Sequence, residues 1–137
     1  AMTAKSMGAQ YAALFAYGAK TLSAEPGSHG AAVVPELGPE PSDLVLTRLH
    51  GLGPMCGTDL DSVLRNLGVT TIVPVGVSLN VAIPNFIMDA VNKSYDVVLP
   101  SDAVAGIPTD YGRAILKNTL SLLSTVVTTD ELIEIWS

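Results

Sequence analysis

An alternation of apolar runs with helical patterns, from residue 43 onward, constrains this fold more than any other feature. Strands rich in β-branched residues and bounded by turn residues are recognisable by that pattern, and helices by a 3.6-residue apolar period. The expected strands are residues 43–48, 69–77, 95–99 and 125–129. The expected helices are residues 58–66, 80–94, 109–123 and 130–136. Strands that alternate with helices form parallel sheets through crossovers, so the sequence predicts an α/β protein, a three-layer sandwich around a mostly parallel central sheet.

Several single residues fix the expected ends of these helices. Thr58 is placed to cap the first helix and Gly68 to stop it. Pro84 is tolerable in the first turn of the second helix, and Thr109 is placed to cap the third. Trp136, close to the end of the chain, is expected to anchor the core.

The first third of the chain is less regular. Residues 7–22 are alanine-rich and could form a helix, although Gly8 and Gly18 weaken that pattern. A short segment at 31–37 contains Pro35, which disfavours a central strand. We expect a single domain over residues 1–137, with residues 1–30 atypical.

Composition excludes some functions and favours others. Seven Lys and Arg against thirteen Asp and Glu give a net charge of −6, which argues against nucleic acid and anionic membrane surfaces as partners. Hydrophobic residues make up 48% of the chain, yet none of the apolar runs is long enough for a membrane span. The surplus apolar surface favours a homo-oligomer. The single cysteine, Cys56, excludes an internal disulfide and fits a cytoplasmic protein without a secretion leader.

Candidate chemistry is expected where strands end, because ligands of open α/β sheets bind beyond the carboxyl ends of the strands. The turn at residues 76–80 runs from a buried strand directly into a helix, and its amides could hold an anion or oxyanion. Ser78 could be a nucleophile, but a turn serine is the simpler interpretation because no G-x-S-x-G elbow surrounds it.

Two other candidates have simpler interpretations too. Cys56 with His50 could form a thiolate pair, although a half-buried loop cysteine fits better. Asp102 could orient a partner or, more simply, cap the following turn. The scattered His and Cys residues predict no metal site, and no motif predicts a cofactor.

Short motifs in a fixed order resemble the isochorismatase-like cysteine hydrolases. They are TDL at 58–60, LRNLG at 64–68, VGVSLNV at 75–81, DA at 89–90, YDVV at 95–98 and DAVA at 102–105. The segment GSHGAAVVPEL at 27–37 also resembles the family's sequence before its lysine-bearing strand. The resemblance spans roughly residues 37–136. It implies a three-layer α/β fold, usually dimeric or tetrameric.

The resemblance also implies an activity. Members hydrolyse C–N bonds of small amides, such as nicotinamide or N-carbamoyl compounds, whereas isochorismatases cleave a vinyl ether. The amidases use an Asp, a Lys and a nucleophilic Cys at a helix start. Backbone amides hold the oxyanion beside a non-proline cis peptide, which falls at Val77–Ser78 in this sequence.

Transferring these residues one by one predicts a degenerate site. The nucleophile position falls on Ala82, which has no nucleophilic atom. The lysine position falls on Arg48, or on Leu49 if the loop aligns without a gap. An arginine keeps the charge but does not shuttle protons. The family's aspartate and its first strand have no match, so the chain is expected to be shortened at its N-terminus, with a longer natural product left open.

We therefore expect an isochorismatase-like protein that has lost the amidase activity but keeps a small-molecule site. The expected binding residues are Val77, Ser78, Asn80, Val81, Ala82 and Ile83, with Arg48 as an anion contact. An active cysteine-free hydrolase of the same family and a non-catalytic, oligomer-forming or partner-binding remnant are the alternatives.

Overall fold

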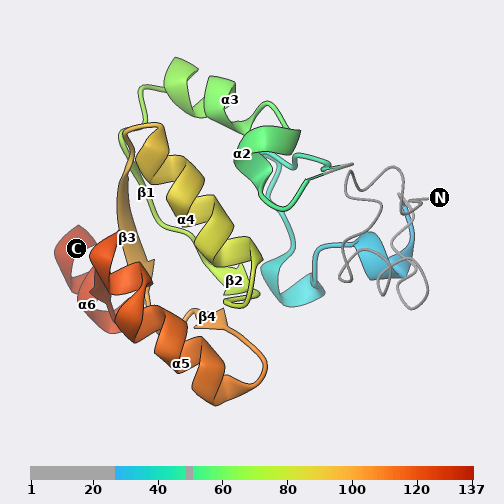
Figure 1. Ribbon diagram of the computed structural model, residues 1–137. Helices are drawn as coiled ribbons and strands as arrows, with labels where there is room; N and C mark the ends of the chain where they lie inside the picture. Colours follow the sequence, from blue (N-terminus) through green and yellow to red (C-terminus); the bar gives the residue numbers. More distant parts are fainter. Residues whose placement is uncertain (1–26, 49–50) are drawn as a thin grey trace. The chain divides into compact units, whose positions relative to one another are not determined.

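The computed structural model describes residues 27–48 and 51–137 (Figure 1). The chain divides into two compact units, Ala1–Gly51 and Leu52–Ser137, which are described separately below. The helix predicted over residues 7–22 lies outside the described residues. The expectation of one domain over the whole chain stays a prediction.

The described part of the first unit contains two short 3₁₀ turns, η1 (His29–Ala31) and η2 (Pro35–Leu37). The strand predicted over residues 43–48 is wrong, because these residues form no ladder in the described structure. Alternating apolar residues make a strand only where a neighbouring strand accepts their hydrogen bonds. Without one, Leu44 and Val45 remain 65% and 64% exposed.

The second unit mixes helices with parallel strands, which confirms the predicted α/β class. Its helices are α2 (Pro54–Gly57), α3 (Leu60–Asn66), α4 (Ala82–Asn92), α5 (Thr109–Asn118), the 3₁₀ turn η3 (Leu120–Leu122) and α6 (Thr129–Trp136). Its strands are β1 (Thr71–Ile72), β2 (Gly76–Val77), β3 (Asp96–Pro100), β4 (Val104–Ala105) and β5 (Thr125–Val127). They form a three-stranded sheet in the order β1-β3-β5 and a two-stranded sheet of β2 and β4. Within the described ranges, none of the helices is long and apolar enough to cross a bilayer.

The strand predicted over residues 69–77 is two strands that belong to different sheets. β1 pairs with β3, whereas β2 pairs with β4. Pro74 lies between them, and a proline has no N–H to donate to a ladder. The chain therefore leaves the first sheet at Pro74 and joins the second at Gly76, where φ is +106°.

Helix α3 has its predicted start and stop signals. The Thr58 hydroxyl accepts from Leu60 N, the first helical residue, although the cap position itself is Asp59. Gly68 adopts φ +70° and donates to Arg65 O, while Val69 N donates to Leu64 O. These two bonds form a Schellman motif, which satisfies carbonyls that the helix end leaves open.

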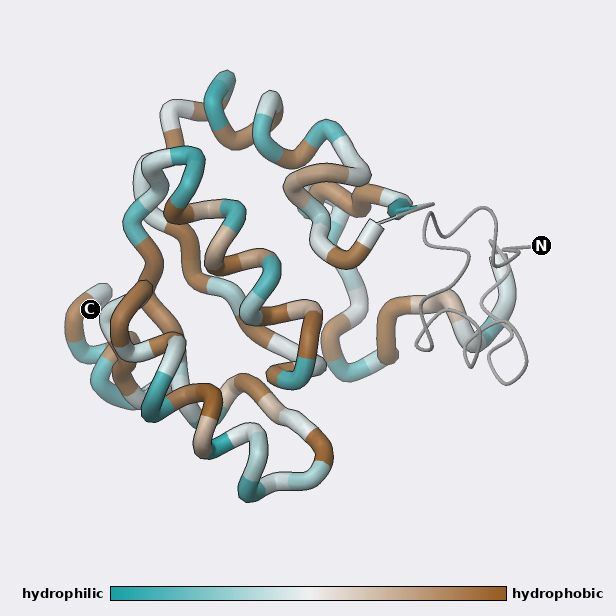
Figure 2. The backbone as a smooth tube through the Cα atoms, in the orientation of Figure 1, coloured by the Kyte–Doolittle hydropathy of each residue, from teal (hydrophilic) through white to brown (hydrophobic). Residues whose placement is uncertain are grey.

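The core of the second unit lies where α4 packs against β3. In Figure 2 the hydrophobic colour follows β3 and recurs along α4. Ile87 on α4 and Leu99 on β3 are both completely buried. Ile83 and Ala90 bury the same face of α4, one helical turn to either side of Ile87. This packing fixes the direction in which α4 leaves the turn before it.

Two predictions about the last helices are wrong. Thr109 does not cap α5, because Pro108 occupies the cap position and Thr109 is the first helical residue. Trp136, the last residue of α6, is 69% exposed, so it does not anchor the core. The start of α6 is instead a capping box, in which Thr128 and Glu131 each accept a hydrogen bond from the other's backbone N–H.

Candidate functional site

The turn between β2 and α4 is the best-defined feature of the candidate site. Gly76 N donates to Ala103 O over 2.9 Å, and Leu79 N donates to Ala105 O over 2.8 Å. The peptide bond between Val77 and Ser78 is cis, at the position that the family resemblance implies. Figure 1 shows β2 and β4 side by side at the end of α4 where this turn lies.

The backbone amides at the start of α4 differ in whether they have a hydrogen-bond acceptor. Ser78 O accepts from Val81 N and Ile83 N, at 3.4 and 3.1 Å. Among the described residues, the Ala82 amide has no backbone acceptor, and Ala82 is the first residue of α4. The amides of a helix start carry a partial positive charge. The turn can therefore interact favourably with a carbonyl or carboxylate oxygen.

The predicted binding residues have different surroundings in this turn. Val77 is 74% exposed, whereas Ile83 is 5% exposed and packs in the core. Ser78, Val81 and Ala82 are half-buried. Arg48 is exposed and belongs to the Ala1–Gly51 unit, which is described by itself.

Asn80 has a protein partner for its amide group. Its Nδ2 donates to Ile107 O over 2.6 Å, and its Oδ1 accepts from Ile107 N over 2.9 Å. The side chain that the sequence suggested for ligand contact thus bonds the loop between β4 and α5.

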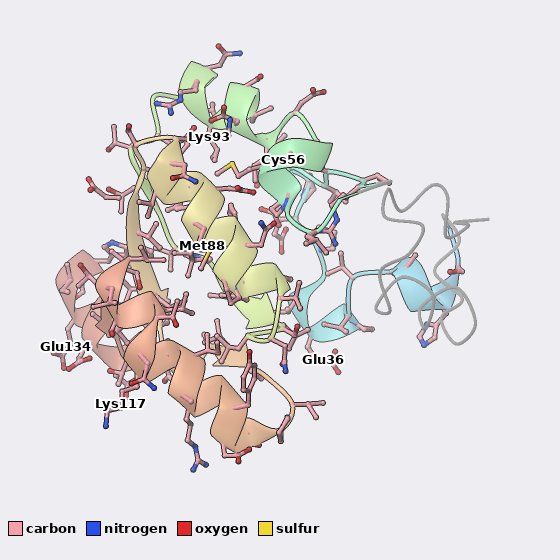
Figure 3. The ribbon with its side chains drawn as sticks, in the orientation of Figure 1. Glu36, Cys56, Met88, Lys93, Lys117 and Glu134 are labelled. Atoms are coloured by element: carbon pink, nitrogen blue, oxygen red, sulfur yellow. The ribbon has the colours of Figure 1, made fainter. Side chains whose placement is uncertain are left out.

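The other nucleophile candidate, Cys56, contacts a carboxylate rather than a histidine in the described structure. Cys56 lies exposed on α2, and its Sγ donates to Asp89 Oδ2 over 3.6 Å. Figure 3 shows the Cys56 side chain between α2 and α4. Its proposed partner His50 lies outside the described residues, and His29 belongs to the other unit. No group of three or more His, Cys, Asp or Glu side chains suited to a metal occurs in residues 27–48 and 51–137.

A polar cluster that sequence reasoning missed joins α3 to the end of α4. Asp61 accepts from Lys93 Nζ at 2.8 Å and from Tyr95 OH at 2.9 Å. Lys93, with Tyr95, lowers the pKa of Asp61, and Asp61 in turn raises the pKa of Lys93. The Arg65 guanidinium lies 4.5 Å from the centre of the Tyr95 ring. All these groups satisfy one another, so the cluster is structural.

Asp102 has the capping role that the sequence favoured, but at a distant helix. Its Oδ1 accepts from both Oγ1 and N of Thr129, each at 2.9 Å, at the start of α6. The hydrogen bond from the Thr129 hydroxyl, together with that from its amide, lowers the pKa of Asp102. The carboxylate also faces the positive end of the helix.

This contact predicts an acid-dependent contribution to stability. Because the folded-state pKa of Asp102 is depressed, its stabilisation is complete above the unfolded pKa of about 3.9 and is lost as the pH falls through the folded-state pKa. Asp102→Asn should therefore lower the free energy of unfolding at neutral pH, and the difference from wild type should shrink in acid. Urea unfolding at several pH values measures it. Thr129→Ser keeps the hydroxyl donor and should behave like wild type. A loss of unfolding free energy in Asp102→Asn that is equal at every pH would contradict the proposed titration of Asp102.

The fold and this turn define an isochorismatase-type domain, and the chain belongs to the isochorismatase family. The family model, an Isochorismatase domain, matches residues 10–131. The ureidoacrylate amidohydrolase RutB of Methylobacterium radiotolerans is 38% identical over 94 residues, which cover 67% of this chain and 36% of that protein.

Solved structures are similar as well. An isochorismatase-like hydrolase from Alkaliphilus metalliredigens has a TM-score of 0.76 and 31% identity, over 81% of this chain and 61% of its own. N-carbamoylsarcosine amidase from Thermoplasma acidophilum has a TM-score of 0.67 and 27% identity, over 76% of this chain and 58% of its own. The chain spans less than two thirds of the length of each of these three proteins.

Proposed function

We propose that the turn at residues 78–82 binds the carbonyl or carboxylate oxygen of a small molecule, and that this site forms no thioester. The observation that carries the proposal is Ala82, the first residue of α4, which offers a backbone amide without a backbone acceptor among the described residues and a methyl side chain. The motif resemblance implies that the family's nucleophile position falls on Ala82. The first property supports binding, and the second removes covalent chemistry.

The chemistry at Ala82 follows from its side chain. In a cysteine amidase a thiolate adds to the amide carbon, the amine leaves with a proton, and water then hydrolyses the thioester. A methyl group has no lone pair with which to begin that sequence. The oxyanion-stabilising part of the mechanism needs only backbone N–H groups, so it can persist without the nucleophile.

The ligand class follows from the relatives. RutB is named for ureidoacrylate and the Thermoplasma enzyme for N-carbamoylsarcosine, and both compounds contain an amide-type carbonyl. A helix-start amide donates to an oxygen acceptor and favours one that carries negative charge, such as a carboxylate or a developing oxyanion. We therefore propose small amides or the matching carboxylic acids as ligands.

The proposed homo-oligomer has separate support. In the Leu52–Ser137 unit, Leu122, Ile135 and Trp136 are 80%, 71% and 69% exposed. Large apolar side chains at the surface favour association.

Thiol chemistry provides the experimental test of the proposal. We expect wild-type protein to release no ammonia from benzamide or N-carbamoylglycine above the buffer rate, and Cys56→Ser to behave identically, because neither offers a thiol at position 82. Ammonia release is measured enzymatically. In the Cys56→Ser background, Ala82→Cys should be alkylated by iodoacetamide, as read by intact mass, because position 82 is half-buried rather than enclosed.

Two other outcomes would overturn part of the proposal. Turnover that survives Cys56→Ser would identify a cysteine-free hydrolase. Turnover that Cys56→Ser abolishes would make Cys56 the nucleophile. Either result would contradict a site limited to binding.

A further inference from the structure

The loop between β4 and α5 is held against the proposed binding turn by the side chain of Asn80. The two hydrogen bonds with Ile107, at 2.6 and 2.9 Å, use both the donor and the acceptor of the carboxamide. Asn80 therefore has little capacity left to bind a ligand. Its role is to position the loop.

The same loop also packs closely against the turn at Gly106. A Cβ atom on Gly106 would lie 2.9 Å from Asn80 Oδ1 and 3.0 Å from Leu79 Cβ. A side chain at position 106 would therefore force Asn80 or Leu79 to shift. Leu79 is 2% exposed, and its amide donates to Ala105 O. The loop and the turn thus form one rigid corner.

Ile107 is an apolar side chain of this loop that is exposed to solvent. It is 87% exposed, although its own N–H and C=O are both bonded to Asn80. Asn80 is two residues before Ala82, so their Cα atoms lie within about 7.6 Å of each other. The backbone of Ile107 is hydrogen-bonded to Asn80, so this residue lies on the same corner of the structure as the Ala82 amide.

We infer that Ile107 is the specificity-determining residue of the turn 78–82 site: it contacts the apolar flank of the bound amide or acid, and Asn80 positions it. This inference rests on the proposed function and deepens it. Ligands with a ring or chain beside the carbonyl are then favoured over fully polar ones, because the contact removes apolar surface of both partners from water.

The test compares two amides that share the carbonyl group and differ in their flank. Benzamide carries an aromatic ring, and acetamide carries only a methyl group. Each is titrated into the full chain labelled at backbone ¹⁵N and isoleucine δ1-methyl positions. We expect both to shift the Ala82 amide resonance, and only benzamide to shift the Ile107 methyl. The methyl of Ile133 on α6, which is 55% exposed, serves as the control and should not move.

Variants complete the test. Ile107→Ala should weaken benzamide binding about three- to tenfold and leave acetamide binding unchanged. Ile133→Ala should change neither. Asn80→Ala should reproduce the selective loss for benzamide while the Ile107 amide resonance moves, because the loop loses its two bonds.

The failures of the two proposals can be separated. If the Ala82 amide shifts while the Ile107 methyl does not, the specificity role is overturned and the binding site stands. If neither resonance responds to either amide, the proposed function itself is overturned. Equal weakening of both amides by Ile107→Ala would also contradict a role in specificity.

Discussion

Replacing Ile87 by alanine is expected to destabilise the protein by about 2–5 kcal/mol, the largest effect on stability that we predict. Ile87 is completely buried on α4, and its side chain belongs to the core formed with β3. Alanine would leave a cavity among side chains that cannot fully collapse into it. Because this core fixes the direction of α4, its loss also disturbs the turn that the helix follows.

The neighbouring residue supplies a matched control. Met88, labelled on α4 in Figure 3, follows Ile87 on the same helix but is 42% exposed. Met88→Ala should change the free energy of unfolding by no more than about 0.5 kcal/mol. Chemical denaturation of both variants measures the difference. Similar losses for the two variants would contradict the burial that the structure assigns to Ile87.

Gly106→Ala is expected to cost about 1–3 kcal/mol and to alter the candidate site at the same time. The new methyl group would lie 3.0 Å from Leu79 Cβ and 3.4 Å from Gly112 Cα. The nearest atom, Asn80 Oδ1 at 2.9 Å, can move with its side chain, whereas Leu79 Cβ is fixed to its backbone and must shift by a few tenths of an ångström. We expect unfolding at lower denaturant and shifted amide resonances at Asn80 and Ile107.

A double-mutant cycle separates this clash from other effects of the substitution. Leu79→Ala keeps Cβ and should not relieve the contact, whereas Leu79→Gly removes the contacted atom and should recover part of the loss. Full additivity of Gly106→Ala with Leu79→Gly would show that the two residues do not meet as described.

Local signals explain which helices and strands the sequence predicted correctly. The stop at Gly68 needs a residue that tolerates a positive φ, and the sequence shows that glycine directly. β3 is apolar from Val97 to Pro100, and the predicted strand at residues 95–99 is offset from the observed Asp96–Pro100 by one residue. The start of α6 also has a local signal in the sequence, since Thr128 and Glu131 have the spacing of a capping box.

The errors concern features that depend on distant parts of the chain. A strand over residues 43–48 requires a partner strand, and a single sequence pattern cannot supply one. Trp136 is apolar, but its burial depends on which surface meets the last turn of α6.

In the candidate site, too, the local features could be predicted from the sequence and the long-range contacts could not. The family motifs located the turn and the cis bond at Val77–Ser78. They could not show that Asn80 bonds a loop 27 residues further along the chain, because side-chain partners across such a separation are set by the fold.

The most direct test of the account is the backbone amide of Ala82 during titration with benzamide. The account predicts a saturable chemical-shift change at Ala82, larger than at amides of α3 or α6, in wild-type protein that has no thiol at that position. An Ala82 amide resonance that stays unchanged in folded protein up to millimolar benzamide would contradict the proposed binding site.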